Sequence, residues 1–129
     1  MLNNLFPNVR PRRLRKNKTI RNLVSETKLH KSKLIQPLFV SDSNPEKQSI
    51  TTMPGQFIHS RDSLFFEIDE LQKLGINTIA LFPNISQTKK DNDGTEALNP
   101  DNFMCKLVSE IKARFNEVVL VTDVALDPY

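Results

Sequence analysis

Residues 118–129 read Val-Val-Leu-Val-Thr-Asp-Val-Ala-Leu-Asp-Pro-Tyr, and this stretch indicates the fold class. The run from Val118 to Thr122 is apolar and β-branched, which predicts a buried strand, and two carboxylates, Asp123 and Asp127, follow it. In α/β enzymes, catalytic groups sit at the carboxyl ends of parallel strands. The stretch therefore predicts a strand that opens onto an active-site edge, and we expect the chain to be cut within that site.

Two other runs in the chain have strand character. Leu34–Val40 and Ile76–Phe82 are short and apolar, although Pro37 would remove a ladder hydrogen bond from the first of them. The segments between these runs and the helices, 41–60 and 84–98, are polar and contain proline or glycine, so they are predicted to be loops.

Two helices are predicted between the strands. The first covers 63–74, with Ser60 or Asp62 as its N-cap and Gly75 just past its end. The second is predicted to start with the Asn-Pro pair at 99–100, where the asparagine would be the cap. Apolar residues at helical spacing predict the buried faces of both helices: Leu64, Ile68 and Leu71, then Met104, Leu107, Val108, Ile111 and Phe115.

The resulting order is strand–helix–strand–helix–strand, which predicts an α/β fold with a parallel sheet. Near-continuous apolar strands are typical of parallel sheets that are covered on both faces. A closed (β/α)8 barrel needs roughly 250 residues, whereas this chain has 129. Three strands would also leave both sheet edges unpaired, so we expect an incomplete α/β domain that aggregates or folds poorly in isolation.

The charge of the chain is unevenly distributed. Residues 1–33 carry ten Lys or Arg and one acid, a net charge of +9, whereas residues 34–129 carry eight basic and fourteen acidic residues, a net charge of −6. We therefore expect a basic N-terminal arm over 1–33 and the first part of a barrel over 34–129. No aromatic residue lies among the cations between Arg10 and Arg21 to stack on bases, so a subunit contact is favoured over nucleic-acid binding.

Composition excludes several classes of site. The single cysteine, Cys105, excludes an internal disulfide and a cysteine-cluster zinc site within this chain, and it is predicted to be a small buried or half-buried filler. His30 and His59 are predicted to be surface residues. No run approaches the roughly 18 apolar residues of a membrane helix, and no basic segment precedes an apolar run at the N-terminus. We expect a cytoplasmic protein.

Short motifs throughout the chain share one family resemblance. They are Arg12-Arg13-Leu14-Arg15, Leu23–Glu26, Leu34–Val40, Ser49–Gly55, Leu74–Ile76 with Leu81–Pro83, Asp93–Ala97 with Asn99-Pro100, and Thr122–Tyr129. In this order, they resemble the N-terminal part of the 5-aminolevulinate dehydratase family, also called porphobilinogen synthase.

The resemblance implies an N-terminal arm that wraps a neighbouring subunit, usually in an octamer, followed by the first three strands and two helices of a TIM barrel. It also implies that the complete protein condenses two molecules of 5-aminolevulinate to porphobilinogen, with loss of two waters, in tetrapyrrole synthesis. Two lysines of the family form Schiff bases with the substrates, and no lysine here matches either one. The chain alone is therefore expected to be inactive. The alternative is a truncated, non-catalytic product that binds nucleic acid or the intact enzyme through its basic arm.

The resemblance also implies roles for individual residues. Zinc-dependent members carry cysteines where this chain has Ala125 and Asp127, so the chain resembles the aspartate-bearing branch, which is often stimulated by magnesium or potassium. Asp123 would be a supporting acid near the substrate, Asp127 would orient the substrate amine or bind a hard cation, and Phe82 would line the pocket. The implied interface residues are Arg12, Arg13 and Arg15.

Overall fold

The structure, a computed structural model, describes residues 12–44 and 46–129. The chain divides into two compact units, the first ending at His30 and the second running from Lys31 to Tyr129. Its elements, in order, are η1 (Arg13–Arg15), α1 (Lys18–Leu23), η2 (Lys31–Lys33), β1 (Ile35–Ser41), β2 (Gln48–Ser49), β3 (Phe57–His59), α2 (Arg61–Leu74), β4 (Thr78–Asn84), η3 (Gln87–Lys89), α3 (Thr95–Leu98), α4 (Phe103–Arg114) and β5 (Val119–Thr122).

The first unit has little apolar material to bury. Its helix α1 begins after Asn17, whose side-chain oxygen accepts a hydrogen bond from the backbone N–H of Ile20 at 2.9 Å. Among the described residues of this unit none is buried, and Leu23 and Leu29 are both highly exposed. The helix is therefore stabilised by its cap and local hydrogen bonds rather than by a core of its own.

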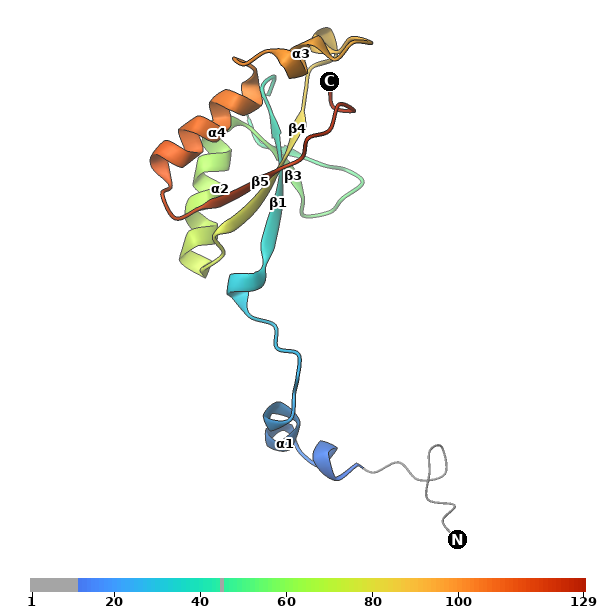
Figure 1. Ribbon diagram of the computed structural model, residues 1–129, viewed down its shortest axis with the longest axis vertical. Coiled ribbons are helices and arrows are strands. Elements are labelled where there is room, and N and C mark those ends of the chain that lie inside the picture. Colours follow the sequence, from blue (N-terminus) through green and yellow to red (C-terminus); the bar gives the residue numbers. More distant parts are fainter. Residues whose placement is uncertain (1–11, 45) are drawn as a thin grey trace. The chain divides into compact units, whose positions relative to one another are not determined.

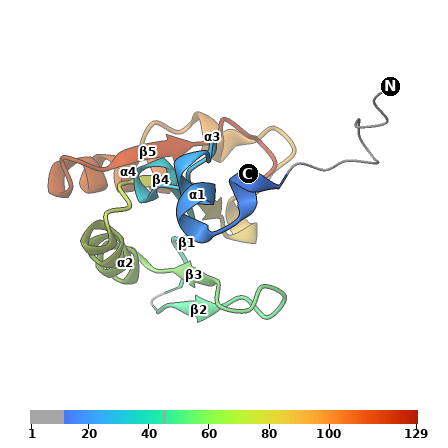
Figure 2. The ribbon, with the colours of Figure 1, turned by 90° about the horizontal axis from the view of Figure 1, so that it is seen from below.

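The second unit is built on a five-stranded sheet in the order β2-β3-β1-β4-β5 (Figure 2). β1 pairs in parallel with β3 and β4, and β5 pairs in parallel with β4, which confirms the predicted α/β sheet. The prediction of a plain loop over 41–60 was wrong, because β2 and β3 form an antiparallel pair within it. These strands have two and three residues, too few for an alternating pattern to be visible in the sequence.

Pro37 lies inside β1, although β1 is the central strand. It is opposite Ala80 of β4, whereas β3 pairs with β1 only at Phe39 and Val40. At Pro37, β1 therefore has a paired neighbour on one side only. This half-open position is one where a strand tolerates a residue without an N–H.

Helices α2 and α4 pack side by side on one face of the sheet (Figure 1). The fully buried residues of this layer come from both helices and from two strands, β1 and β4, with Val118 just before β5: Leu64, Ile68, Leu107, Ile111, Val40, Ile79, Leu81 and Val118. The predicted apolar faces of both helices are confirmed. The predicted cover of both sheet faces was wrong for the described residues, because Ile35, Val119 and Val121 on the opposite face are exposed.

Helix α2 has the termini that its sequence predicts. The Ser60 hydroxyl accepts a hydrogen bond from the Ser63 N–H, and Gly75 ends the helix with φ +80°, a left-handed conformation that favours glycine. Its N–H donates to the Gln72 carbonyl. Local interactions at Ser60 and Gly75 therefore fix the first and last residues of α2.

Helix α4 starts three residues later than predicted. Its N-cap is Asn102, whose side-chain oxygen accepts from the Cys105 N–H at 2.8 Å, so the prediction of Asn99 as the cap was wrong. Asn99 instead accepts from the Asp101 N–H and forms the turn that precedes the helix. Four consecutive residues from Asn99 to Asn102 suit turns or caps, so local preference alone did not select one.

We expect Asn102→Ala to lower the free energy of unfolding by about 1 kcal/mol, because the N-cap hydrogen bond of α4 is lost. Asn99→Ala is the matched control and should lower it by less, since the side chain of Asn99 makes only exposed hydrogen bonds, one in the turn and one to Glu96. Urea unfolding of both variants measures the difference. An equal or larger loss in Asn99→Ala would place the cap at the earlier residue.

His59 at the end of β3 is buried, with 2% of its surface exposed, so the prediction of a surface histidine was wrong. Its Nδ1 lies 3.4 Å from the Ser63 hydroxyl. Burial lowers the pKa of His59, and the nearby Lys47 ammonium lowers it further, although the Glu67 carboxylate and Ser63 act in the opposite direction. The neutral imidazole is therefore the form that the folded chain favours.

Because the folded-state pKa of His59 lies below its ordinary value of 6.5, the unfolded chain binds this proton more readily. We expect the contribution of His59 to stability to be present above pH 6.5 and to be lost progressively as the pH falls below it toward the lowered pKa. His59→Gln should weaken this acid dependence. Urea unfolding of the unmodified chain and of the variant over a series of pH values measures both slopes, and identical slopes would contradict the prediction.

Candidate functional site

The carboxyl ends of the parallel strands meet at one edge of the second unit, where α3 and the segment after β5 also lie (Figure 1). A cavity of about 630 Å³ opens there. It is lined by the end of β4, by α3, by the first turns of α4 and by the whole of 122–129. The predicted site residues Phe82, Asp123 and Asp127 all belong to this lining.

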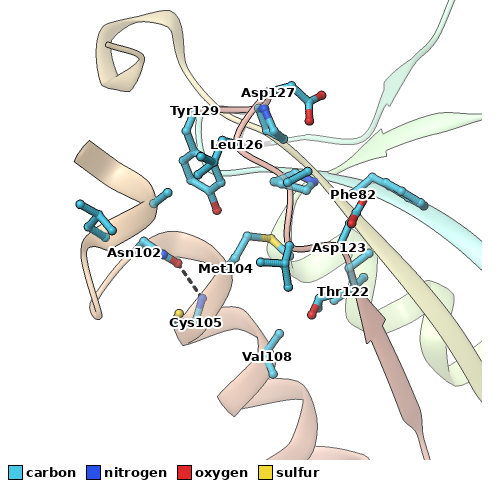
Figure 3. Close-up of a pocket in the computed structure, with 17 residues that line it drawn as sticks. Phe82, Asn102, Met104, Cys105, Val108, Thr122, Asp123, Leu126, Asp127 and Tyr129 are labelled. Atoms are coloured by element: carbon cyan, nitrogen blue, oxygen red, sulfur yellow. Dashed lines mark hydrogen bonds between the residues drawn. The ribbon is translucent and has the colours of Figure 1, made fainter. Parts of the chain in front are cut away.

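Phe82 and Asp123 lie at corresponding positions of neighbouring strands. Leu81 of β4 is paired with Thr122 of β5, and Phe82 and Asp123 are the next residue of each chain segment. Figure 3 shows the Asp123 side chain beside Phe82. The Phe82 ring also packs against Phe39, with ring centroids 5.8 Å apart. The arrangement sets a solvent-accessible carboxylate next to an aromatic wall.

Asp127 follows Asp123 by four residues in the same segment and also lines the cavity, and Figure 3 shows the two carboxylates as separate groups along it. Among the described residues no group of three His, Cys, Asp or Glu side chains could hold a metal ion. Ala125, between the two aspartates, offers no side-chain ligand. The residues present therefore do not form a metal site by themselves, and Asp127 supplies one carboxylate at most.

The far wall of the cavity carries residues that the sequence did not identify. Asn102, Met104 and Tyr129 all line it, and the Tyr129 hydroxyl points toward α4 (Figure 3). Burial raises the pKa of Tyr129, and the charges of Cys105 and Glu96 add to this effect. The phenol is therefore a neutral hydrogen-bond donor over a wide pH range.

Cys105 also lines the cavity and is exposed, so the prediction of a buried or half-buried filler was wrong. The buried stripe of α4 passes through Met104 and Leu107, and Cys105 falls on the neighbouring face of the helix. Helical spacing alone did not separate the two faces, because Cys105 is three residues from Val108, which belongs to the predicted apolar face and is only partly buried.

A second group of polar residues at this edge was also missed. Asp42 follows β1, and its carboxylate accepts a hydrogen bond from the Lys89 ammonium at 2.5 Å. The two residues are 47 positions apart in the sequence, so no local motif indicates the pair. The only sequence clue is that a carboxylate follows the predicted first strand, as Asp123 follows the third.

The three arginines predicted at an interface lie in the first unit. Arg12, Arg13 and Arg15 are exposed, and the Arg15 carbonyl accepts from the Arg21 guanidinium at 3.1 Å. They lie in a different unit from the cavity residues. Within 12–44 and 46–129 no helix combines the length and the apolar character needed to cross a bilayer.

Comparisons with known proteins place this architecture in a family. The family model described as Delta-aminolevulinic acid dehydratase matches residues 8–129. The dehydratase of Chlamydia pneumoniae is 43% identical over 120 residues, which cover 93% of this chain and 36% of that protein. The dehydratase of Bradyrhizobium diazoefficiens is 42% identical over 121 residues, which cover 94% of this chain and 34% of that protein.

A solved structure agrees with these relatives. It is the delta-aminolevulinic acid dehydratase (porphobilinogen synthase) of Toxoplasma gondii ME49 in complex with the reaction product porphobilinogen. It superposes with a TM-score of 0.88 and 40% identity over 94% of this chain and 34% of that one. The chain thus spans about a third of the length of the proteins that it matches, and within that third its sheet is the beginning of their barrel. The chain belongs to the delta-aminolevulinic acid dehydratase family.

Proposed function

We propose that this chain is the N-terminal third of a porphobilinogen synthase, which condenses two molecules of 5-aminolevulinate to porphobilinogen with loss of two waters. The observation that carries the proposal is the Asp123 carboxylate beside Phe82 at the carboxyl ends of β4 and β5. This is the edge at which barrels of this kind bind their substrates. The similarity to a product-bound relative supports the choice of substrate.

Each lining residue has a proposed task. Asp123 acts as a supporting acid, because a carboxylate near the reacting atoms can hold or release a proton and stabilise a developing positive charge. Phe82 forms an apolar wall that excludes water from the carbon skeleton of the substrate. Asp127 orients the substrate amine through its negative charge. The lysines that form Schiff bases are assigned to the remaining part of the complete protein, because no lysine of the chain lines the cavity among the described residues.

For the complete protein we propose Mg²⁺, with K⁺ as the alternative, since this chain offers carboxylates and no cysteine cluster. Asp127 would supply one oxygen ligand. The described residues lack the other ligands, so no step of the reaction is derived through the metal ion. A chain with one cysteine does not depend on an oxidising compartment, which supports a cytoplasmic location.

We propose that the first unit packs on a neighbouring subunit of a homo-octamer. Leu14, Leu23 and Leu29 are exposed on it, and a contact with another chain would bury them. Arg12, Arg13 and Arg15 flank Leu14 in the sequence and would pair with acidic groups of the neighbour. Exposed leucines favour a protein contact over nucleic acid, whose backbone offers no apolar surface.

The nucleotide sequence after the Tyr129 codon is the first check. An open frame that continues for about twice the present length, with lysines in later apolar strands, is expected. A stop codon at that point would favour the alternative, a non-catalytic chain that binds the intact enzyme.

Activity is tested in a chimera that joins this chain to the remaining two-thirds of the Chlamydia pneumoniae relative. We expect it to produce porphobilinogen from 5-aminolevulinate, and we expect Asp123→Asn to lower kcat by about 100-fold or more. Asp101→Asn, at an exposed aspartate before α4, is the matched control and should leave kcat unchanged. The proposed role is wrong if Asp123→Asn and the control have the same kcat. An inactive chimera beside an active parent would contradict the proposed function itself.

A further inference from the structure

Lys89 connects three segments at the edge that carries the cavity. Its ammonium donates to Asp42, which follows β1, at 2.5 Å and lies 3.9 Å from a carboxylate oxygen of Glu96 in α3. Both carboxylates are largely shielded, with side chains 12% and 18% exposed, whereas Lys89 is 42% exposed. One cation therefore compensates two sheltered carboxylates from segments that are far apart in the sequence.

Asp42 is held in place independently of Lys89. The Ser43 hydroxyl donates to its other oxygen at 2.8 Å. Burial alone would raise the pKa of Asp42, but the hydrogen bonds from Lys89 and Ser43 outweigh burial, and the pKa is lowered. Asp42 is thus a charged anchor at the end of β1, the strand at the centre of the sheet.

The segment that Lys89 holds forms one wall of the cavity. It leads through Gly94 into α3, where Ala97 and Leu98 line the cavity. Its internal hydrogen bonds are short-range. The Asp91 carboxylate accepts from the Thr95 N–H at 2.9 Å, and the other bonds join residues two to four apart. Among the described residues these bonds hold the segment in shape. The ion pair of Lys89 with Asp42 joins the segment to the end of β1.

The opposite wall lies close to the start of α3. A side-chain carbon built on Gly94, the N-cap residue of α3, would lie 3.8 Å from Leu126, so the Gly94 backbone and Leu126 are near neighbours. The Glu96 carboxylate is one of the groups that raise the pKa of Tyr129, which lines the same cavity. A shift of α3 would therefore change the distance between the two walls.

We propose that Lys89 is a positioning residue for this site: it holds α3, and with it the Ala97–Leu98 wall, against the end of β1 and so sets the width of the cavity. Without the ammonium, Asp42 and Glu96 would be two sheltered carboxylates that repel each other, and α3 would move away from β1. The inference rests on the proposed function, because it takes this cavity to border the substrate.

The neighbouring lysine provides an internal comparison. Lys90 belongs to the same segment but forms no ion pair with any residue among 12–44 and 46–129. A general effect of positive charge at this edge would involve both lysines. A positioning effect would involve Lys89 alone, and it would be retained by arginine, which keeps the charge and the reach.

The experiment compares Lys89→Met, Lys89→Arg and Lys90→Met in the active chimera. Steady-state kinetics with 5-aminolevulinate should show that Lys89→Met raises KM by about tenfold while kcat changes by less than about threefold, because the wall contacts substrate without taking part in bond making. Lys89→Arg and Lys90→Met should keep both parameters within about threefold of the unmodified protein.

Amide hydrogen exchange gives a second readout that does not depend on activity. The N–H groups of Thr95 and Ala97 should exchange about tenfold faster in Lys89→Met, whereas those of α2 and β4 should be unchanged. Should Lys89→Met fail to fold, Asp42→Asn removes the same pair from the other side and should show the same faster exchange.

Equal exchange and equal kinetics in Lys89→Met and Lys90→Met would overturn the proposal. A rise of KM in Lys89→Arg as large as that in Lys89→Met would also overturn it. If the unmodified chimera is inactive, the proposed function fails and the exchange rates alone decide the role of Lys89, so the two failures can be told apart.

Discussion

The packing of α2 and α4 on one face of the sheet is the constraint on which the rest of the second unit depends. Ile68 and Ile111 meet Val40 and Ile79 in a layer that water does not reach. Each of these side chains contributes about 1.5–3 kcal/mol through burial. Because α2 runs back from β3 to β4 and α4 runs back toward β5 across the same face, β3, β4 and β5 are parallel. β1 pairs in the same direction with β3 and β4, so the carboxyl ends of these strands come together at one edge.

Parts of this arrangement could be predicted because the responsible interactions are local. Ser60 and Gly75 identify the ends of α2 through a hydrogen bond three residues away and a single backbone conformation. Asp123 could be singled out because a carboxylate directly follows an apolar strand. The helical stripe of α4 could be predicted although its first residue could not, because four turn-forming residues precede Phe103 and only tertiary packing selects Asn102, which is buried.

The features that escaped prediction depend on contacts between distant segments. In the sequence, His59 looks like an isolated polar residue. It is buried because β3 lies between β2 and β1 in the sheet and because α2 begins only two residues after it. The pairing of Lys89 with Asp42 depends on β1 and β4 being neighbours in register. A charged residue in a polar loop carries no local sign of such a partner, since solvated lysines have the same surroundings in the sequence.

The pleat of the strands explains why the carboxylate lies where it does. On the face opposite the helices, Ile35, Thr78 and Val119 form one row, and Pro37, Ala80 and Val121 form the next. Phe39 and Phe82 follow, and Asp123 comes after the last paired residue of β5.

In a (β/α)8 barrel such rows form layers that fill the interior, so the deeper rows must be apolar or small. A carboxylate at Val121, two residues earlier, would be enclosed by the layer above it and would lose most of its hydration. At Asp123 the charge stays hydrated while the Phe82 ring beside it closes the layer below. The apolar rows and the exposed Asp123 therefore follow from one strand pattern. In this pattern the charged side chain lies only in the row nearest the solvent.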